Sequence, residues 1–241
     1  NNKTGTLANG PVWTTGKLNN ALRFDGIDDH VDAGNIGNVN TAEMSVSFWV
    51  NFSQLPGSWD AVISKGIGGG TDQFQYVIGD NGAGGNLSLN TSDAITQYNG
   101  NCVINLTGKT NQWFHYTYVW SDTGNWCRAY ENGIQAASQN TAIGMNPLAT
   151  HPLRIGQGYG ANGQEVNATI DDVRIYTRAL TTQEISDLYN IITPTPTPTP
   201  TASPTSSASP APSPSTTPTL TLLPPYPSPH LHLTQLSLAA V

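Results

Sequence analysis

The nine residues 44–52 alternate between apolar and mostly polar side chains, and this alternation constrains the fold more than any other feature of the chain. One face of an extended strand would carry Met44, Val46, Phe48, Val50 and Phe52. The other face would carry Ser45, Ser47, Trp49 and Asn51. A period of two residues is typical of a β-strand with one buried face. The segment therefore predicts a half-buried strand.

Further strand-like segments follow along the chain, separated by clusters of Gly and Asn. They span residues 61–65, 74–79, 86–90, 103–106, 113–120, 126–131, 153–156 and 168–176. Asn132-Gly133 lies between two strand-like runs and predicts a tight hairpin, because both central positions of a type I′ turn need positive φ. Many short strands with Gly-rich connections indicate an all-β sandwich.

One short helix is expected near the end of this region. Thr181 and Glu184 stand three residues apart, and the apolar residues Ile185 and Leu188 follow. This spacing is the signature of a capping box, in which each side chain accepts a hydrogen bond from the backbone of the other residue. We expect a helix of one or two turns whose apolar face packs on the sandwich.

The residues that can build a core end near Tyr189. From Asn190 onward the chain has no Lys, Arg, Asp or Glu, and it holds 13 of the 17 prolines. Closely spaced prolines remove backbone donors and favour an extended, unpacked chain. We predict a folded domain at residues 1–190 and a Pro/Thr/Ser-rich linker at 191–220. Residues 221–241 are an unstructured tail or the truncated start of another region, too short in apolar sequence to span a membrane.

The charge of the chain argues against nucleic acid as a partner. The formal net charge is −7, from 9 basic and 16 acidic side chains, and no basic cluster occurs. The residues Asn, Gly, Ser and Thr are abundant, which is typical of secreted all-β proteins. We therefore expect a secreted or cell-surface protein.

Two distant segments lead to a family resemblance. They are ALRFDGIDDHVDAG at residues 21–34 and TIDDVRIYTRALTTQEISDLY at 169–189. Together they resemble the laminin-G-like members of the concanavalin-A-like jelly-roll family over about residues 5–190. The resemblance implies a two-sheet antiparallel jelly-roll in which both segments form adjacent closing strands, with one short C-terminal helix before the disordered Pro-rich tail. The fold carries many functions, so the function must be argued from the site.

The chain has two cysteines, Cys102 and Cys127. In an exported protein such a pair predicts a disulfide, and closing this loop would stabilise the fold by roughly 3–4 kcal/mol. The pairing would make 103–106 and 126–131 neighbouring strands. Two free thiols are the alternative, whereas a metal site is not favoured because no second Cys or His lies at ligand spacing.

Aspartates gather in the two closing segments. Asp25, Asp28, Asp29 and Asp32 lie within eight residues, and Asp171-Asp172 occur in the strand expected to approach them. Crowded carboxylates need a cation or hydrogen-bond donors, and hard oxygen ligands suit Ca²⁺. The family resemblance adds that many such sandwiches hold a structural calcium near their terminal strands. The alternative is that these carboxylates cap turns.

Strand alternation selects among these aspartates. If Val173 and Ile175 face the core, Asp171 shares their face, whereas Asp172 points outward. The expected calcium ligands are therefore Asp25, Asp28 and Asp171, with backbone carbonyl oxygens.

The sequence predicts that the domain is not an enzyme. Retaining glucanases of this fold need paired carboxylates on one strand, about 5 Å apart. None of the four glutamates has such a partner, and the adjacent Asp171 and Asp172 face opposite ways on a strand. No nucleophile elbow or zinc motif occurs.

Aromatic residues in loop-like contexts suggest a binding function. Sugars are often bound by an aromatic face framed by amides and carboxylates. The candidate ligand-binding residues are Trp59, Asp60, Tyr98, Asn99, Trp126 and Tyr159. Alternatively, each aromatic residue covers the end of the sandwich. We expect a non-catalytic, calcium-stabilised carbohydrate-binding module whose partner is a polysaccharide or glycan. The alternative is an adhesion or structural domain that binds a protein or a second copy of itself.

Overall fold

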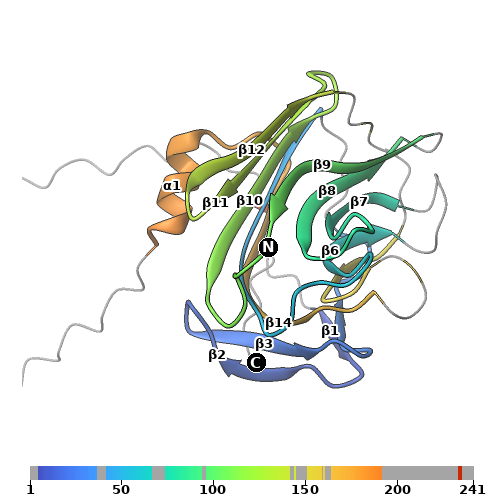
Figure 1. Cartoon of the computed structure of the whole chain (residues 1–241), viewed down its shortest axis with the longest axis vertical. Coiled ribbons are helices and arrows are strands. Elements are labelled where there is room, and N and C mark those ends of the chain that lie inside the picture. Colours follow the sequence, from blue (N-terminus) through green and yellow to red (C-terminus); the bar gives the residue numbers. More distant parts are fainter. Residues whose placement is uncertain are drawn as a thin grey trace, which may run out of the picture. The chain divides into compact units, whose positions relative to one another are not determined.

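The computed structural model describes residues 5–36, 42–66, 74–93, 96–141, 144, 151–158, 160, 164–191 and 233–234. These residues form two antiparallel β-sheets and one helix (Figure 1). Sheet A contains, in order across the sheet, β1 (Thr6–Ala8), β4 (His30–Asp32), β13 (Leu153–Ile155), β6 (Ala61–Gly66), β7 (Phe74–Gly79), β8 (Asn86–Ser92) and β9 (Gln97–Asn105).

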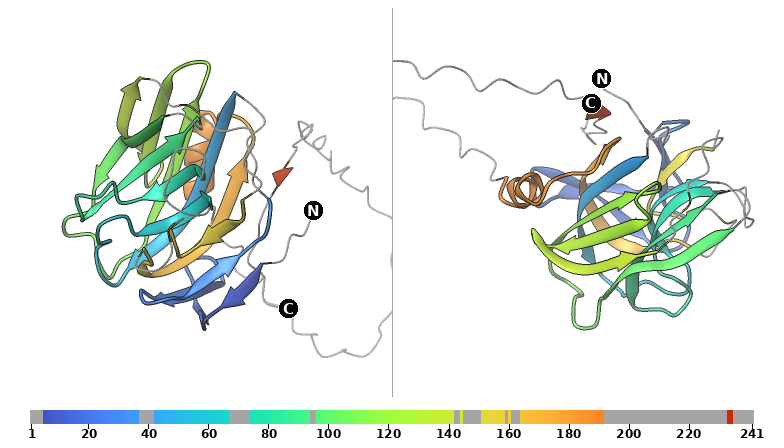
Figure 2. Two further views of the ribbon diagram at one scale, coloured as in Figure 1. Left: turned by 90° about the vertical axis from the view of Figure 1, so that its right-hand side faces the viewer. Right: turned by 90° about the horizontal axis from the view of Figure 1, so that it is seen from above.

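Sheet B has eight strands among the described residues. Their order is β12 (Ile134–Asn140), β11 (Trp126–Glu131), β10 (Phe114–Ser121), β5 (Glu43–Phe52), β14 (Asn167–Tyr176), β3 (Asn20–Asp25) and β2 (Val12–Thr15), with β15 (Leu233–Thr234) paired to β14. The two sheets pack face to face as a jelly-roll sandwich, as two further views show (Figure 2). The predicted all-β fold is confirmed.

The core lies between the sheets and includes the predicted apolar face of β5. The strand is not half-buried as predicted, because Ser45, Ser47 and Trp49 on its other face are at most 3% exposed where the segment 178–189 lies against them. In β5 the five alternating side chains from Met44 to Phe52 are at most 1% exposed and belong to the core. Sheet A contributes apolar side chains such as Tyr76, Ile78, Leu87 and Leu89 from its inner face. Burial of this apolar surface is the main force that holds the sheets together.

Several strand boundaries differ from the predicted ones. β7 and β11 have the predicted bounds, whereas β9 begins at Gln97, six residues earlier than expected. β1 and β2 lie at the ends of their sheets and were not predicted. Their three and four residues are mostly exposed, so no apolar alternation marks them.

The two closing segments lie side by side, as expected. Asn167 to Ile170 of β14 pair with Asp25 to Leu22 of β3. The same strand pairs along its length with β5. β14 therefore lies between the strand of the first motif and the central strand of sheet B.

A β-bulge in β14 overturns the predicted orientation of Asp171. Asp171 is opposite Trp49, but the next pair joins Arg174 to Ser47. The extra residue Asp172 has φ 49°, so Ile170 and Val173 both face the core. Asp171 therefore shares the outer face, where its Oδ2 accepts a hydrogen bond from the backbone N–H of Leu18 at 2.7 Å.

The predicted disulfide between Cys102 and Cys127 is confirmed, but it does not join neighbouring strands. Cys102 lies in β9 at the edge of sheet A, and Cys127 lies in β11 of sheet B. Gln139 of β12 strengthens the same connection, because its Oε1 accepts from Cys102 N and its Nε2 donates to Asn101 Oδ1. The bond therefore links the two sheets along one side of the sandwich.

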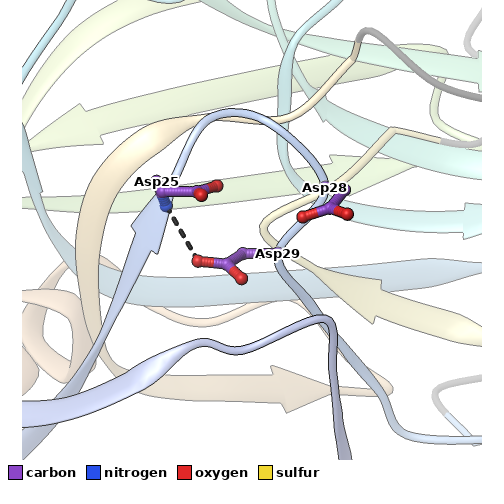
Figure 3. Close-up of side chains that lie close together, drawn as sticks. All are labelled: Asp25, Asp28 and Asp29. Atoms are coloured by element: carbon purple, nitrogen blue, oxygen red, sulfur yellow. Dashed lines mark hydrogen bonds between the residues drawn. The ribbon is translucent and has the colours of Figure 1, made fainter.

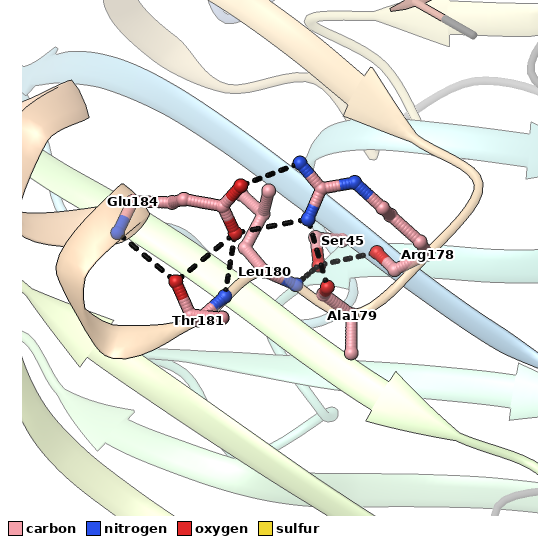
Figure 4. A network of polar contacts seen from close by, with 6 residues as sticks. All are labelled: Ser45, Arg178, Ala179, Leu180, Thr181 and Glu184. Carbon is pink, nitrogen blue, oxygen red and sulfur yellow. Dashed lines mark hydrogen bonds and ion pairs between the residues drawn. The ribbon is translucent and has the colours of Figure 1, made fainter. Parts of the chain in front are cut away.

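The helix α1 (Thr182–Tyr189) has the predicted capping box. Thr181 Oγ1 accepts from Glu184 N, and Glu184 Oε2 accepts from Thr181 N (Figure 4). Arg178 also donates two hydrogen bonds to the Glu184 carboxylate, at 2.9 and 2.7 Å. Ile185 and Leu188 are buried against the outer face of sheet B. No helix in the described part of the chain is long and apolar enough to cross a membrane.

Candidate functional site

A buried carboxylate organises the turn between β7 and β8. Asp80 is 1% exposed, and its Oδ1 accepts backbone N–H bonds from Gly82 at 2.7 Å and Gly84 at 3.0 Å. Two longer bonds come from Trp59 N to Oδ1 at 3.4 Å and from Asn86 N to Oδ2 at 3.3 Å. Four backbone amides therefore compensate the charge of one aspartate. They also attach the loop before β6 to this turn.

The backbone of Trp59 is held in a conformation that bulky residues rarely adopt. Its φ is 71°, in the left-handed region. The indole lies against Gly82, where an added Cβ would be 2.7 Å from Trp59 Cζ2. A glycine at this position therefore leaves room for the ring. Backbone strain of this kind persists only where the surroundings enforce it, and it often marks a binding site.

Asp60, the residue after Trp59, adds a second carboxylate near Asp80, whose backbone N–H donates to Asp60 O at 2.8 Å. The Oδ2 of Asp60 accepts the Gly57 N–H at 2.6 Å. Burial raises the pKa of the Asp60 carboxyl, the Gly57 N–H opposes this shift, and the charges of Glu165 and Asp80 raise the pKa further. The region around Trp59 is therefore electronegative.

Asparagine side chains border the same turn. Asn86 Nδ2 donates to Asn81 Oδ1 at 2.9 Å, whereas Asn86 Oδ1 is buried without a hydrogen-bond partner. Asn86 is only 8% exposed, so this oxygen is a buried acceptor that the described chain does not satisfy. Asn81 Nδ2 lies 2.8 Å from the position of a Cβ on Gly100, the neighbour of the exposed Asn99.

Glu165 reaches this end of sheet A from the segment before β14. It forms an isolated bridge with Ala61, the first residue of β6. Its Oε1 accepts from Gln157 Nε2 and its Oε2 from Gln164 N, both at 2.7 Å. Glu165 is buried, so both oxygens are already used inside the protein.

The structure brings some predicted ligand residues together and separates others. Trp59 and Asp60 lie beside the β7–β8 turn. Asn99 lies in β9 between the partners of Leu89 and Thr91, and its neighbour Gly100 is the residue that approaches Asn81 of that turn. Trp126 does not lie near this turn, because it pairs with Ser121, which pairs with Glu43 at the opposite end of β5 from the Trp59 loop. The ten residues of β5 span roughly 30 Å. Tyr159 and the side chain of Tyr98 lie outside the described residues.

Sequence reasoning missed Asp80, Asn81 and Asn86. All three belong to the segment Asp-Asn-Gly-Ala-Gly-Gly-Asn at residues 80–86. An aspartate at the end of a predicted strand, followed by several glycines, could have indicated a turn whose amides converge on a carboxylate.

A second group of carboxylates lies in the turn between β3 and β4. One oxygen from each of Asp25, Asp28 and Asp29 falls within 4.8 Å of the others (Figure 3). Asp29 is 4% exposed, and its Oδ2 accepts the Asp25 N–H at 3.0 Å. Burial raises the pKa of Asp29, the Asp25 N–H opposes this, and the Asp25 and Asp28 charges raise it further.

Asp171 does not join this group in the described structure. Asp25 is opposite Asn167. Asp171 therefore lies four residues further along β14, roughly 13 Å away. Among the predicted calcium ligands, Asp25 and Asp28 are grouped, and Asp29 takes the place expected for Asp171.

Both turns lie at the same end of the sandwich. We call the β3–β4 turn with Asp25, Asp28 and Asp29 the acidic turn. Its Asp25 is opposite Asn167 in the sheet. Glu165, two residues before Asn167, forms a bridge with Ala61. Ala61 immediately follows Asp60. The short segment 165–167 therefore connects the two carboxylate-bearing turns.

Comparison with known proteins identifies relatives of this architecture. The family model described as the concanavalin A-like lectin/glucanases superfamily matches residues 25–186. No curated protein sequence matches the chain. Domain 4 of AbnA, a GH43 extracellular arabinanase from Geobacillus stearothermophilus solved with arabinotriose, has a TM-score of 0.60 and 22% identity, covering 77% of this chain and 87% of that one.

Bacterial toxin domains share the fold as well. The binding domain of Paraclostridial Mosquitocidal Protein 1 has a TM-score of 0.59 and 16% identity, covering 78% of this chain and 47% of that one. The botulinum neurotoxin serotype D binding domain has a TM-score of 0.56 and 17% identity, covering 78% and 46%. This chain therefore spans about half the length of these two toxin structures. At these identities the likeness shows the fold alone.

Proposed function

The chain belongs to the concanavalin A-like lectin/glucanases superfamily, and from this membership we propose that it is a non-catalytic carbohydrate-binding domain whose site surrounds Trp59. The observation that carries the proposal is the fixed, left-handed Trp59, whose indole is seated against Gly82. A rigid aromatic ring offers a sugar a binding surface at low entropic cost. The arabinotriose complex of the similar AbnA domain supports a saccharide ligand.

The polar groups around the ring match the hydrogen bonds that a sugar needs. The partly exposed Asn81, which borders the same turn, can bond a sugar hydroxyl through its amide, whereas Asn86 Oδ1 is enclosed by the protein. Asn99, an exposed residue of β9, would provide a further amide for a ligand that extends along the sheet. The ring would contact the C–H face of the sugar, while these amides fix its orientation.

The carboxylates of the site support binding without hydrolysis. Asp80 accepts four backbone N–H groups, and Glu165 has both oxygens occupied by Gln157 and Gln164. A glycosidase needs two carboxyl groups that are free to exchange protons or attack the sugar on opposite sides of one bond. Asp80 instead holds the β7–β8 turn together, and Glu165 holds Gln157 and Gln164 before β14.

We also propose that the acidic turn binds a structural Ca²⁺. The donors of Asp25, Asp28 and Asp29 are hard oxygens close enough to share one ion. Burial and the charges of Asp25 and Asp28 raise the pKa of Asp29, and the nearby hydrogen bond from the Asp25 N–H and the charge of Arg23 do not fully offset this rise. A bound calcium ion would supply the compensating positive charge. The disulfide between Cys102 and Cys127 supports the proposal that the domain is secreted or exposed at a cell surface.

A second candidate function, binding of a protein partner or of a second copy, is favoured by strand β12. This strand is at the edge of sheet B, has no charged residue, and leaves Ile134 75% exposed. Uncharged edge strands are able to pair with another chain. The test is the oligomeric state of the full chain, measured by sedimentation for wild type and for Gln135→Lys, which places a charge in the exposed segment of β12. If the chain associates through β12, wild type sediments as an oligomer and the lysine variant as a monomer.

The carbohydrate proposal is tested by retention of the full chain on immobilised arabinan, xylan and mixed-linkage β-glucan. Trp59→Ala is compared with Trp126→Ala, a matched change at the opposite end of β5. We expect at least one polysaccharide to retain the wild-type chain, Trp59→Ala to lose about tenfold or more in affinity, and Trp126→Ala to bind normally. Equal binding by folded Trp59→Ala would remove this residue from the site. Release of reducing ends would contradict the non-catalytic assignment.

A further inference from the structure

The described lysines and arginines are all engaged with other groups of the chain. Four bond to backbone carbonyl or side-chain amide oxygens: Arg23, Lys65, Arg128 and Arg154. Three pair with carboxylates: Lys109, Arg174 and Arg178. Lys17 lies over the Trp49 ring, 4.9 Å from its centroid, on the outer face of sheet B. Lys3, the ninth basic residue, lies outside the described residues.

Two arginines lie near this end of the molecule: Arg23, whose Nη1 donates to Asn167 Oδ1 at 2.7 Å, and Arg154. The Nη1 of Arg154 donates to Gln157 Oε1 at 3.0 Å, and Gln157 in turn donates to Glu165. The Nε of Arg154 is buried without a partner. Two of the three guanidinium nitrogens of Arg154 are therefore held within the protein, while the residue as a whole is partly exposed. In the described part of the chain, no lysine or arginine extends from the turn that holds Trp59.

Negative charge is concentrated at the same place. Asp60, Asp80 and Glu165 meet there, and the charges of the other two contribute to the raised pKa of Asp60. The hydrogen-bond donors around Asp80 and Glu165 are neutral amides, which stabilise each charge without cancelling it. Water screens such charges poorly where they are buried, so their field extends to the ring.

From this balance we infer that the Trp59 site takes neutral glycans and excludes uronated, sialylated or sulfated ones. The inference rests on the proposed function, because it specifies the ligand class of the same site. An anionic sugar on the indole would lie close to three carboxylates with no cation to pair with. A neutral sugar would instead need only hydrogen bonds with neutral amides, such as that of the partly exposed Asn81. The acidic side chains near Trp59 would thus repel anionic sugars while leaving neutral sugars free to bind the aromatic ring.

The test uses two derivatives of whichever polysaccharide retains the full chain best among arabinan, xylan and mixed-linkage β-glucan. One portion is carboxymethylated to a low degree, and the other is hydroxyethylated to the same degree, so that the two differ in charge at similar bulk. At low salt we expect the carboxymethyl form to bind at least about tenfold more weakly than the hydroxyethyl form. This difference should shrink at high salt because the repulsion is screened.

Asp60→Asn provides the internal check. The amide oxygen can still accept the Gly57 N–H, so the loop keeps its hydrogen bond while it loses one charge. Because Asp60 is itself one of the candidate ligand-binding residues, the readout is the ratio of the two affinities within this variant, and we expect that ratio to be closer to one than in wild type. Equal or tighter binding of the carboxymethyl form by wild type, lost in Trp59→Ala, would overturn the inference and leave carbohydrate binding intact. Failure to bind any polysaccharide would overturn both.

Discussion

Two turns at one end of this sandwich bury aspartates, and they balance the negative charge differently. In the β7–β8 turn, Asp80 accepts four backbone N–H groups. In the β3–β4 turn, Asp29 accepts the Asp25 N–H and faces the carboxylates of Asp25 and Asp28. In the first turn, backbone N–H groups of the chain itself compensate the charge. In the second turn, three carboxylates lie together in an arrangement that could coordinate a cation.

Glycine content explains the difference. Gly82, Gly84 and Gly85 have positive φ, which lets successive N–H groups converge on one carboxylate. The acidic turn has one such glycine, Gly26, before three residues with larger side chains. Its backbone cannot turn as tightly, so fewer amides reach the buried carboxylate.

The largest effect is expected for Asp80→Asn. The amide keeps the shape of the side chain but removes the charge that strengthens the backbone hydrogen bonds. We expect the free energy of unfolding to fall by about 3 kcal/mol in urea titrations. The control is Asp187→Asn on the exposed face of α1, which should change it by less than about 0.5 kcal/mol. Similar stabilities for the two variants would mean that Asp80 does not organise its turn.

Calcium should stabilise the fold through the acidic turn and not through the other aspartates. At a concentration 100 times its dissociation constant, Ca²⁺ should raise the free energy of unfolding by about 2.7 kcal/mol relative to chelator. Asp28→Asn should lose this increment, whereas Asp171→Asn should keep it because Asp171 lies elsewhere on β14. Thermal unfolding with EDTA or Ca²⁺ measures both. Identical curves for wild type in the two conditions would disprove the calcium site.

Asp29→Asn should change how the free energy of unfolding depends on pH, because Asp29, unlike Asp80, has too few backbone donors to compensate its charge. The folded-state pKa of Asp29 is raised above 3.8, so without calcium its ionisation opposes folding, and stability falls as pH rises through the raised pKa. The variant should lack this fall and be more stable than wild type in chelator near neutral pH, by about 1 kcal/mol. Parallel pH profiles of wild type and variant would show that Asp29 carries no such penalty.

A third carboxylate, Glu184, is balanced by an arginine and should give the smallest effect. The Arg178 guanidinium lowers the pKa of Glu184 to about 2 from 4.5, against partial burial that raises it. Its stabilising contribution is therefore present above pH 4.5 and is lost as pH falls toward 2. Because the pair is partly exposed, we expect less than about 1 kcal/mol. Acid titration of Glu184→Gln should lack this loss, and an unchanged profile would contradict the assignment.

The sequence predicted features that depend on local pattern. The core-facing residues of β5 and the Thr181–Glu184 capping box were predicted correctly because neighbouring residues alone determine them. The predicted half-burial of β5 was wrong because its other face is covered by residues far away in the sequence. The position of Asp171 was wrong because the bulge depends on a positive φ at Asp172, which no period-two pattern encodes.

The candidate site was only partly accessible to sequence reasoning. Trp59, Asp60 and Asn99 were identified by residue type in loop-like contexts; the structure places Trp59 and Asp60 beside one turn and Asn99 in β9. Trp126 satisfied the same criterion but lies at the opposite end of β5, because its position depends on strand register. Asp80 was missed because its role becomes visible only when the amides of Gly82 and Gly84 converge on it.

The inter-sheet disulfide also determines where the sandwich can come apart. Cys102 and Cys127 fasten the side formed by β9, β11 and β12, so a breathing motion that parts the sheets must start at the other side. There the chain crosses from β3 of sheet B to β4 of sheet A through the acidic turn. The two sides would then respond to different signals, one to reducing agents and the other to loss of the proposed calcium ion. Protease sensitivity under each treatment would report which side had opened.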